Sequence, residues 1–187
     1  MKIHAFNPSM LAILMAASLL PEICFAQTST NPPPKIWGPE TAGQCISIWT
    51  PKLKYHRGEE IKIYMSIKNV GTNEVRFAVV NSLSVYDAVV QIGEKAIQPT
   101  VDGKMKSDGF KQSGGSLAVE ILKPDEEDTV KNYDYHPYYP LSQIYDLSTT
   151  GTYKVKLTRK LIDPHPPMER VRVTSNEIEI IVEYVND

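Results

Sequence analysis

The chain has 187 residues, 42% of them hydrophobic, and a formal net charge of −2 at pH 7. This length is enough for one domain with a substantial core. The nearly balanced charge gives no long-range attraction to nucleic acid or to an anionic membrane, so we expect a partner of neither kind.

The N-terminus has the features of a secretory signal peptide. Lys2 precedes the apolar run LAILMAASLL, and small residues at Cys24 and Ala26 mark a cleavage site. We predict cleavage after Ala26 and export to the periplasm or the extracellular space. An alternative is a lipoprotein acylated at Cys24, but Ile23 stands where a small residue is required. No later stretch is long and apolar enough for a transmembrane helix, so we expect no membrane insertion.

Cleavage would leave Cys45 as the single cysteine of an exported protein. An intramolecular disulfide is then impossible, and the core must supply the stability. We interpret Cys45 as a small buried hydrophobic residue. The alternatives are an intermolecular disulfide and a reactive thiol, which would need a histidine and an orienting partner that nothing nearby supplies.

Beyond the signal peptide the chain divides into two parts. Residues 27–43 contain the Pro-rich stretch TSTNPPPK, which predicts a flexible, extended lead-in. Residues 44–187 form the predicted domain, and their dominant hydrophobic period is two. In residues 61–68, for example, isoleucines and methionine alternate with lysines, tyrosine and serine, which is typical of a half-buried antiparallel strand.

The same period recurs to the C-terminus. Strands are predicted around residues 44–50, 75–80, 84–93, 116–122, 153–160 and 177–185. In the strand at 153–160, Tyr153, Val155 and Leu157 are expected to point inward. Residues 102–115 contain four glycines and no clear hydrophobic period, so they predict a long loop. Without any helical stripe, the pattern indicates an all-β fold, an antiparallel β-sandwich of about seven to nine strands.

The segments YDLSTTGTYKVKLTRK and VTSNEIEIIV resemble the last two strands of bacterial exported immunoglobulin-like domains. These domains are distantly similar to those of the intracellular-proteinase-inhibitor type. The resemblance implies an immunoglobulin-like sandwich with a tyrosine corner at Tyr153, in which Tyr145, Asp146 and Gly151 have structural roles. The chain departs from the pattern at Asp125, where these domains usually have glycine.

No residue pattern indicates catalysis. The histidines of the predicted domain, His56, His136 and His165, have no metal-ligand spacing. Acidic pairs occur at turns, where solvated carboxylates are usual, and no nucleophile elbow or phosphate-binding glycine loop is present. We therefore expect a protein that is not an enzyme and that has no metal or cofactor.

Five of the ten tyrosines lie in NYDYHPYYPLSQIYD, residues 132–146. The prolines around Tyr138 and Tyr139 favour an extended connection on the surface. Tyrosines on such a segment either contact a partner or cover the base of the sandwich, and the sequence leaves both open. If the domain binds through an aromatic surface, Tyr138, Tyr139 and His136 are the predicted contact residues.

These observations predict a secreted, non-catalytic binding module with a protein partner, a protease being one class of partner that it could inhibit. The segments 102–115 and 161–170 are long enough to act as inhibitory loops. The alternative is a carbohydrate-binding or cell-envelope-associated module that uses exposed tyrosines as stacking platforms.

Overall fold

A computed structural model describes residues 35–79, 82–112, 118–129, 138–162 and 170–184 of the chain. The described part is mostly β-structure in antiparallel sheets, as the period of two predicted. It contains twelve strands, more than the predicted seven to nine, because several strands of only three residues are too short to leave a hydrophobic pattern.

The first sheet has the order β1-β3-β8, and β9 pairs with another part of β3. Its strands are β1 (Gln44–Trp49), β3 (Lys62–Asn69), β8 (Glu127–Thr129) and β9 (Tyr138–Pro140). In the antiparallel register of β1 and β3, Ile46 lies opposite Ile67 and Ile48 lies opposite Met65. The apolar positions of the two strands therefore share one face of the sheet.

The second sheet has the order β2-β12-β10-β5-β6, with β11 also paired to β10. Its strands are β2 (Lys54–His56), β5 (Tyr86–Ile92), β6 (Lys95–Ile97), β10 (Gly151–Ile162), β11 (Arg170–Thr174) and β12 (Ile178–Glu183). Only β2 runs parallel to its neighbour, β12. A separate pair is formed by β4 (Val75–Val79) and β7 (Ala118–Leu122).

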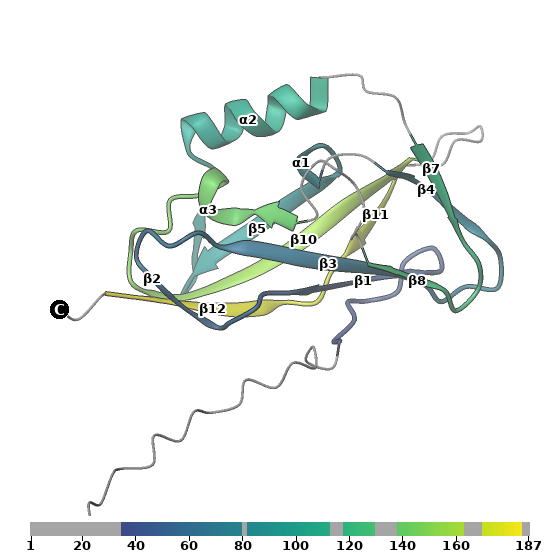
Figure 1. Cartoon of the computed structure of the whole chain (residues 1–187), viewed down its shortest axis with the longest axis horizontal. Coiled ribbons are helices and arrows are strands. Elements are labelled where there is room, and N and C mark those ends of the chain that lie inside the picture. The colour runs from purple at the N-terminus through teal and green to yellow at the C-terminus, as the bar shows by residue number, and fades with distance from the viewer. Residues whose placement is uncertain (1–34, 80–81, 113–117, 130–137, 163–169, 185–187) are drawn as a thin grey trace, which may run out of the picture. The chain divides into compact units, whose positions relative to one another are not determined.

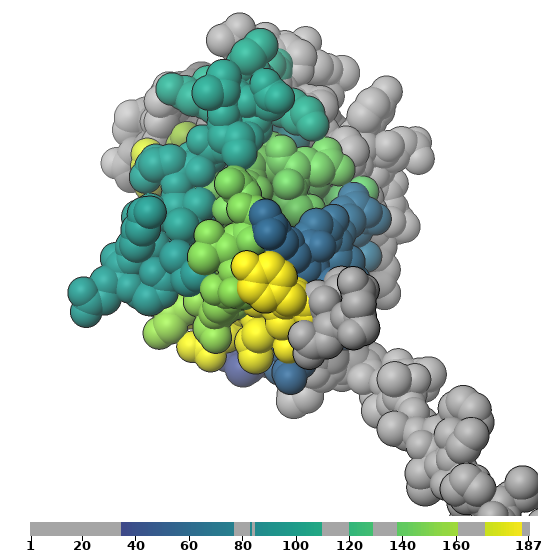
Figure 2. Space-filling model, turned by 90° about the vertical axis from the view of Figure 1, so that its left-hand side faces the viewer, coloured from purple at the N-terminus to yellow at the C-terminus, as the bar shows by residue number. Residues whose placement is uncertain are grey.

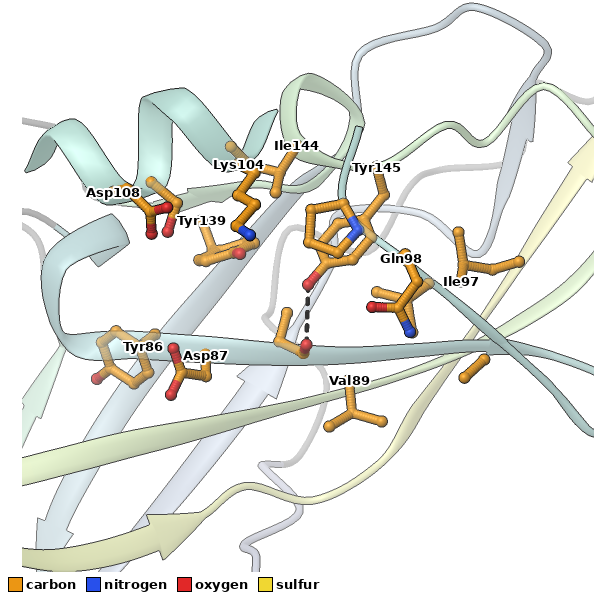
Figure 3. A pocket seen from close by; sticks show the side chains of 15 residues that line it. Tyr86, Asp87, Val89, Ile97, Gln98, Lys104, Asp108, Tyr139, Ile144 and Tyr145 are labelled. Carbon is orange, nitrogen blue, oxygen red and sulfur yellow. Dashed lines mark hydrogen bonds between the residues drawn. The ribbon is translucent and has the colours of Figure 1, made fainter. Parts of the chain in front are cut away.

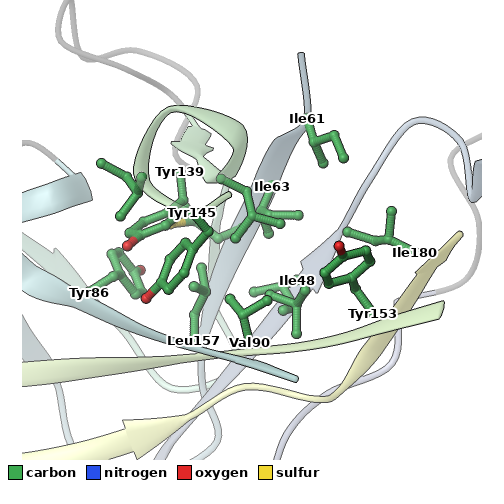
Figure 4. Packing of buried hydrophobic residues seen from close by; sticks show 14 of the residues in the cluster. Ile48, Ile61, Ile63, Tyr86, Val90, Tyr139, Tyr145, Tyr153, Leu157 and Ile180 are labelled. Atoms are coloured by element: carbon green, nitrogen blue, oxygen red, sulfur yellow. The ribbon is translucent and has the colours of Figure 1, made fainter. Parts of the chain in front are cut away.

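One hydrophobic core joins the inner faces of the two larger sheets. Ile46, Met65 and Ile67 come from the first sheet, and they share the cluster with Val155 and Leu157 of the second. Figure 4 shows side chains of both sheets meeting in this core. Tyr153, Val155 and Leu157 are each at most 1% exposed, so the predicted inward parity of this strand is confirmed.

The free edge of β1 is closed by side-chain and lead-in contacts. The Asn176 side chain accepts a hydrogen bond from the Ile48 amide (2.7 Å) and donates one to the Ile48 carbonyl (3.1 Å). The backbone amide of Gly38 donates to the Ile46 carbonyl at 2.9 Å. A Cβ at Gly38 would collide with the backbone around Ser175, so glycine allows this close approach. Parts of residues 35–43 thus contact the sheet, ahead of the predicted domain boundary at residue 44.

The predicted loop at 102–115 is wrong over residues 102–112, which belong to helix α2 (Val101–Gln112). The amide of Gly103 donates to the Thr100 hydroxyl at 2.9 Å, so Thr100 caps the helix. Gly103 lies so close to Ile144 that a Cβ would collide with the Ile144 backbone. The helix lies over α3 (Leu141–Ile144) and α1 (Ser82–Val85), as Figure 1 shows. Tertiary contacts therefore favour a helix where the glycine content suggested a loop.

The turn after β7 keeps a conformation that usually requires glycine. Asp125 has a φ of 64°, in the left-handed region, and its amide donates to the Asn69 carbonyl at 3.0 Å. Aspartate is among the few residues that tolerate this region. The departure at Asp125 from the resemblance pattern therefore leaves a glycine-like turn in place.

Candidate functional site

The two adjacent tyrosines predicted to contact a partner lie on opposite faces of the first sheet. In the register of β9 with β3, Tyr139 lies opposite Ile63, and Tyr138 lies opposite Tyr64. Ile63 belongs to the core, so Tyr139 also points inward and is only 2% exposed. The prediction that Tyr139 lies on the surface is therefore wrong, because neighbouring residues of a strand must face opposite sides. His136 lies outside the described residues.

Tyr138 belongs to a row of rings on the outer face. We call Trp49, Tyr64 and Tyr138, which lie side by side on β1, β3 and β9, the aromatic row. The Trp49 and Tyr64 rings are stacked, with centroids 6.0 Å apart and planes at 23°. The Tyr64 and Tyr138 rings are 6.1 Å apart and tilted by 56°. All three side chains are half-buried, so they pack on the sheet and still reach solvent.

Two lysines extend the aromatic row at its ends. The ammonium of Lys35 lies 5.4 Å from the Trp49 ring centroid and forms an ion pair with Glu127. The ammonium of Lys62 lies 4.7 Å from the Tyr138 ring centroid. Both distances are typical of cation–π contacts.

Lys62 also has a carboxylate partner, Glu60, at 2.8 Å. The hydrogen bond from Lys62 lowers the pKa of the Glu60 carboxyl, and the same bond raises the pKa of Lys62. Glu60 accepts a further hydrogen bond from the Gln143 amide at 3.3 Å. This end of the aromatic row is therefore bordered by a charged pair that stays ionised at neutral pH.

The two members of the aromatic row that were not predicted have a signal in the sequence. Trp49 and Tyr64 alternate with the core isoleucines of their strands, which places both rings on the outward face. A large aromatic side chain on the polar face of a strand is a candidate contact residue. What the sequence did not contain was the pairing that brings the two rings next to Tyr138.

The residues expected to be structural lie at the start of β10 and before it. The Tyr153 hydroxyl donates to the Thr149 carbonyl at 2.6 Å, which is the geometry of a tyrosine corner. The Asp146 carboxylate accepts a hydrogen bond from the Ser148 amide at 2.9 Å, and hydrogen bonds from Ser148 lower its pKa. Gly151 has a φ of 148°, which an L side chain rarely adopts.

The fourth structural candidate, Tyr145, is buried beside Tyr139, as Figure 4 shows. Its hydroxyl donates to the Ala88 carbonyl at 2.8 Å. The two tyrosine hydroxyls also form a hydrogen bond with each other, and since the Tyr145 proton is directed to Ala88, Tyr139 is the donor. Burial raises the pKa of both phenols, so both stay protonated near neutral pH.

A pocket of about 570 Å³ lies between α2 and the β5–β6 side of the second sheet. We call it the α2 pocket. Its lining comes from β5, β6, α2 and the segment of β9 and α3, and includes Asp87, Lys104, Asp108 and Tyr145. Figure 2 shows this side of the molecule, with the teal segments of β6 and α2 next to the green segment around α3.

A second hollow, of about 590 Å³, lies on the other side of Tyr145. It is lined by the turn at residues 56–61 together with Ser142, Gln143 and Asp146. The backbone separates it from the α2 pocket, because Pro99 bridges to Tyr145 and the Thr100 amide donates to Ile144.

Two features of the described ranges concern thiol chemistry and metal binding. Cys45 is buried there, and burial, followed by the nearby Glu40 carboxylate, raises the pKa of its thiol. Among these residues no three His, Cys, Asp or Glu side chains are close enough to hold a metal ion. The same part of the chain has no helix that is both long and apolar enough to cross a membrane.

Of the two predicted inhibitory loops, the first is largely the helix α2. The middle of the second, residues 163–169, lies outside the described part of the chain. Comparison with protein-family models and with curated proteins finds no match for this chain. The candidate sites are therefore argued from their own geometry.

Proposed function

We propose that the protein is an exported, immunoglobulin-like β-sandwich that binds another protein without catalysis. The topology supports the fold. In an immunoglobulin-like domain the first, second and fifth strands share one sheet, and the third, sixth and seventh share the other. Here β1, β3 and β8 form one sheet, while β5, β10 and β12 adjoin in the other. The bond from Tyr153 to Thr149 adds the tyrosine corner.

The aromatic row is the observation that carries the binding proposal. Tyrosine and tryptophan dominate protein interfaces because they offer a large contact area for few rotatable bonds. In Trp49, Tyr64 and Tyr138 this area is held on paired strands, so little ordering entropy is lost on binding. The pairs Lys35–Glu127 and Lys62–Glu60 supply the polar rim that such interfaces have.

The geometry of the rings favours a protein over a glycan as the partner of the aromatic row. A sugar ring stacks on an open aromatic face. Lysine ammonium groups lie over the rings of Trp49 and Tyr138, and the Trp49 ring also stacks on Tyr64. These contacts leave the ring edges for a partner, which the side chains of a protein surface can match.

The test compares two tyrosine variants as bait. The variant Tyr64→Ser/Tyr138→Ser removes two rings of the aromatic row. Tyr184→Ser is the matched control, because Tyr184 is 59% exposed and does not belong to the row. Proteins captured from native exported material by the wild type and the control, but not by the row variant, are purified and their affinities are measured. We expect at least a 30-fold weaker affinity for the row variant, corresponding to about 2 kcal/mol.

Two outcomes would refute this proposal. A purified partner that binds the row variant as tightly as the wild type contacts another surface. A glycan that binds the wild type on an array and loses affinity with the row variant would assign the row to carbohydrate. A panel of purified proteases, assayed with the wild type and the row variant, tests whether the protein partner is a protease.

The proposed export depends on the signal peptide pattern of residues 1–26. N-terminal sequencing of the exported protein should find Gln27 as the first residue. A mature protein beginning with a fatty-acylated Cys24 would instead establish a lipoprotein.

A further inference from the structure

The α2 pocket has features of a small-molecule site that are independent of the aromatic row. Its volume of about 570 Å³ lies within the range of roughly 300–1,000 Å³ typical of ligand pockets. Polar side chains reach into it from two sides. In Figure 3, Lys104 and Asp108 extend from α2 toward the strand that bears Asp87. Since Lys104 and Asp108 are four residues apart, they lie on the same face of the helix.

The charges around the pocket nearly cancel. The Asp87 carboxylate forms an ion pair with Lys160 at 2.9 Å, so part of its charge is already neutralised. The remaining charged groups of the lining are one cation, Lys104, and one anion, Asp108. A ligand with a net charge would meet no matching excess of opposite charge here.

Hydrogen-bond donors and acceptors are mixed around the rim. Lys104 donates, the two aspartates accept, and the Gln98 amide and Ser107 hydroxyl can do both. Each hydroxyl of a ligand both donates and accepts, so it can pair with any of these groups.

The rest of the lining is apolar. Val89 and Ile97 provide accessible aliphatic surface, and the buried side chains of Ile144, Tyr139 and Tyr145 form the floor behind it. A purely apolar ligand would make no hydrogen bond to Asp108 or Lys104 and would displace water from Asp108, which is unfavourable. A sugar ring has both an apolar C–H face and a rim of hydroxyl groups, and so it matches both parts of the lining.

We propose that the α2 pocket binds one residue of a neutral sugar, either free or at the end of a glycan. The apolar C–H face packs on Ile97 and on the exposed part of the Tyr145 ring. The hydroxyl groups bond to Lys104 and Asp108 on the helix and to Asp87 on the strand.

The experiment is a titration of the isotope-labelled protein by NMR with named probes. These are glucose, galactose, mannose and N-acetylglucosamine, together with the disaccharides maltose, cellobiose and lactose. We expect at least one probe to give saturable shifts of backbone amides in α2 and β5. A disaccharide that binds more tightly than its monosaccharide indicates a glycan end, and equal affinities indicate a free sugar.

Two variants and one control test the residue assignment. Lys104→Met and Asp108→Ala should each weaken the binding of that probe tenfold or more. Lys106→Met changes an exposed lysine of the same helix outside the pocket lining, and it should bind as the wild type does. Both pocket variants alter side chains that reach solvent, and the spectra themselves show whether the fold is kept.

Several results would overturn the proposal. The proposal is wrong if no sugar causes saturable shifts in α2 and β5. It is also wrong if Lys104→Met or Asp108→Ala binds the sugar as tightly as the wild type does. Leucine, included as a zwitterionic probe, would overturn it by binding this pocket where every sugar fails. Since Tyr64 and Tyr138 do not line the α2 pocket, the result does not depend on the outcome for the aromatic row.

Discussion

Replacing each of two adjacent tyrosines separately tests how β9 is placed on the first sheet. Tyr139→Ala should strongly destabilise the domain, whereas Tyr138→Ala should have only a small effect on the free energy of unfolding. The side chains differ in burial, because Tyr139 is 2% exposed within the core and Tyr138 is half-buried on the outer face.

The size of the effect follows from what each side chain contacts. Truncating a buried aromatic ring to alanine removes its transfer free energy and leaves a cavity, which together cost about 3 to 5 kcal/mol. Losing the Tyr139 hydroxyl also removes the donor to Tyr145. Truncating Tyr138 removes its contacts with Tyr64 and Lys62, which lie on the outer face of the sheet. This truncation should cost about 1 kcal/mol or less.

Urea unfolding followed by tryptophan fluorescence and thermal melting measure both variants. For a domain of this size, a loss of about 3 to 5 kcal/mol lowers the Tm by roughly 6 to 20 °C. Tyr139→Phe separates the contribution of the buried ring from that of the hydroxyl group. It keeps the ring and should lose only about 1 kcal/mol, for the missing hydrogen bond.

The opposite pattern would refute the reasoning. If Tyr139→Ala has the same Tm as the wild type, or if Tyr138→Ala lowers the Tm more, then the register of β9 on β3 places Tyr138 rather than Tyr139 in the core. Equal and large losses in both variants would show that both rings belong to the core, and the aromatic row would lose its third member.

Three further predictions concern the core and the edge of β1. Tyr153→Phe should lower the free energy of unfolding by about 1 kcal/mol in urea titrations, because the hydrogen bond to the Thr149 carbonyl is lost. An unchanged free energy would contradict the tyrosine corner. Asn176→Ala should cost about 2 to 4 kcal/mol, because it leaves the buried amide and carbonyl of Ile48 without their side-chain partners, and a change below 1 kcal/mol would contradict this. Cys45 should react slowly with a thiol reagent until the protein unfolds, since burial raises its pKa and the thiolate forms only at a higher pH than in a free thiol; rapid labelling of the folded protein at neutral pH would be the contrary result.

The sequence by itself was enough to predict the strands of the central core. Residues 61–68 and 153–160 alternate between apolar and polar side chains, and the observed inner faces have the predicted parity. Parity is a local property of an extended chain, because successive side chains point to opposite sides. For that reason Ile63, Met65 and Val155 could be assigned to the core without knowledge of their neighbours.

The parity of Tyr138 and Tyr139 could not be assigned in this way, since β9 has only three residues and no alternation of its own. Its pairing with β3 decides which ring is buried. The same pairing places Tyr138 beside Tyr64, and the pairing of β1 with β3 adds Trp49. Candidate members of a surface site were therefore visible in the sequence, while their assembly into a row required the sheet.

Helix α2 and the α2 pocket depended on tertiary structure for a different reason. Two glycines within residues 101–112 lower the intrinsic helix propensity, and the sequence therefore favoured a loop. In the folded protein Thr100 caps the helix, and Gly103 lets it approach the backbone of Ile144. A glycine that weakens an isolated helix can thus be the residue that allows it to dock. This docking brings Lys104 and Asp108 to the same pocket as Asp87, although no local pattern connects them.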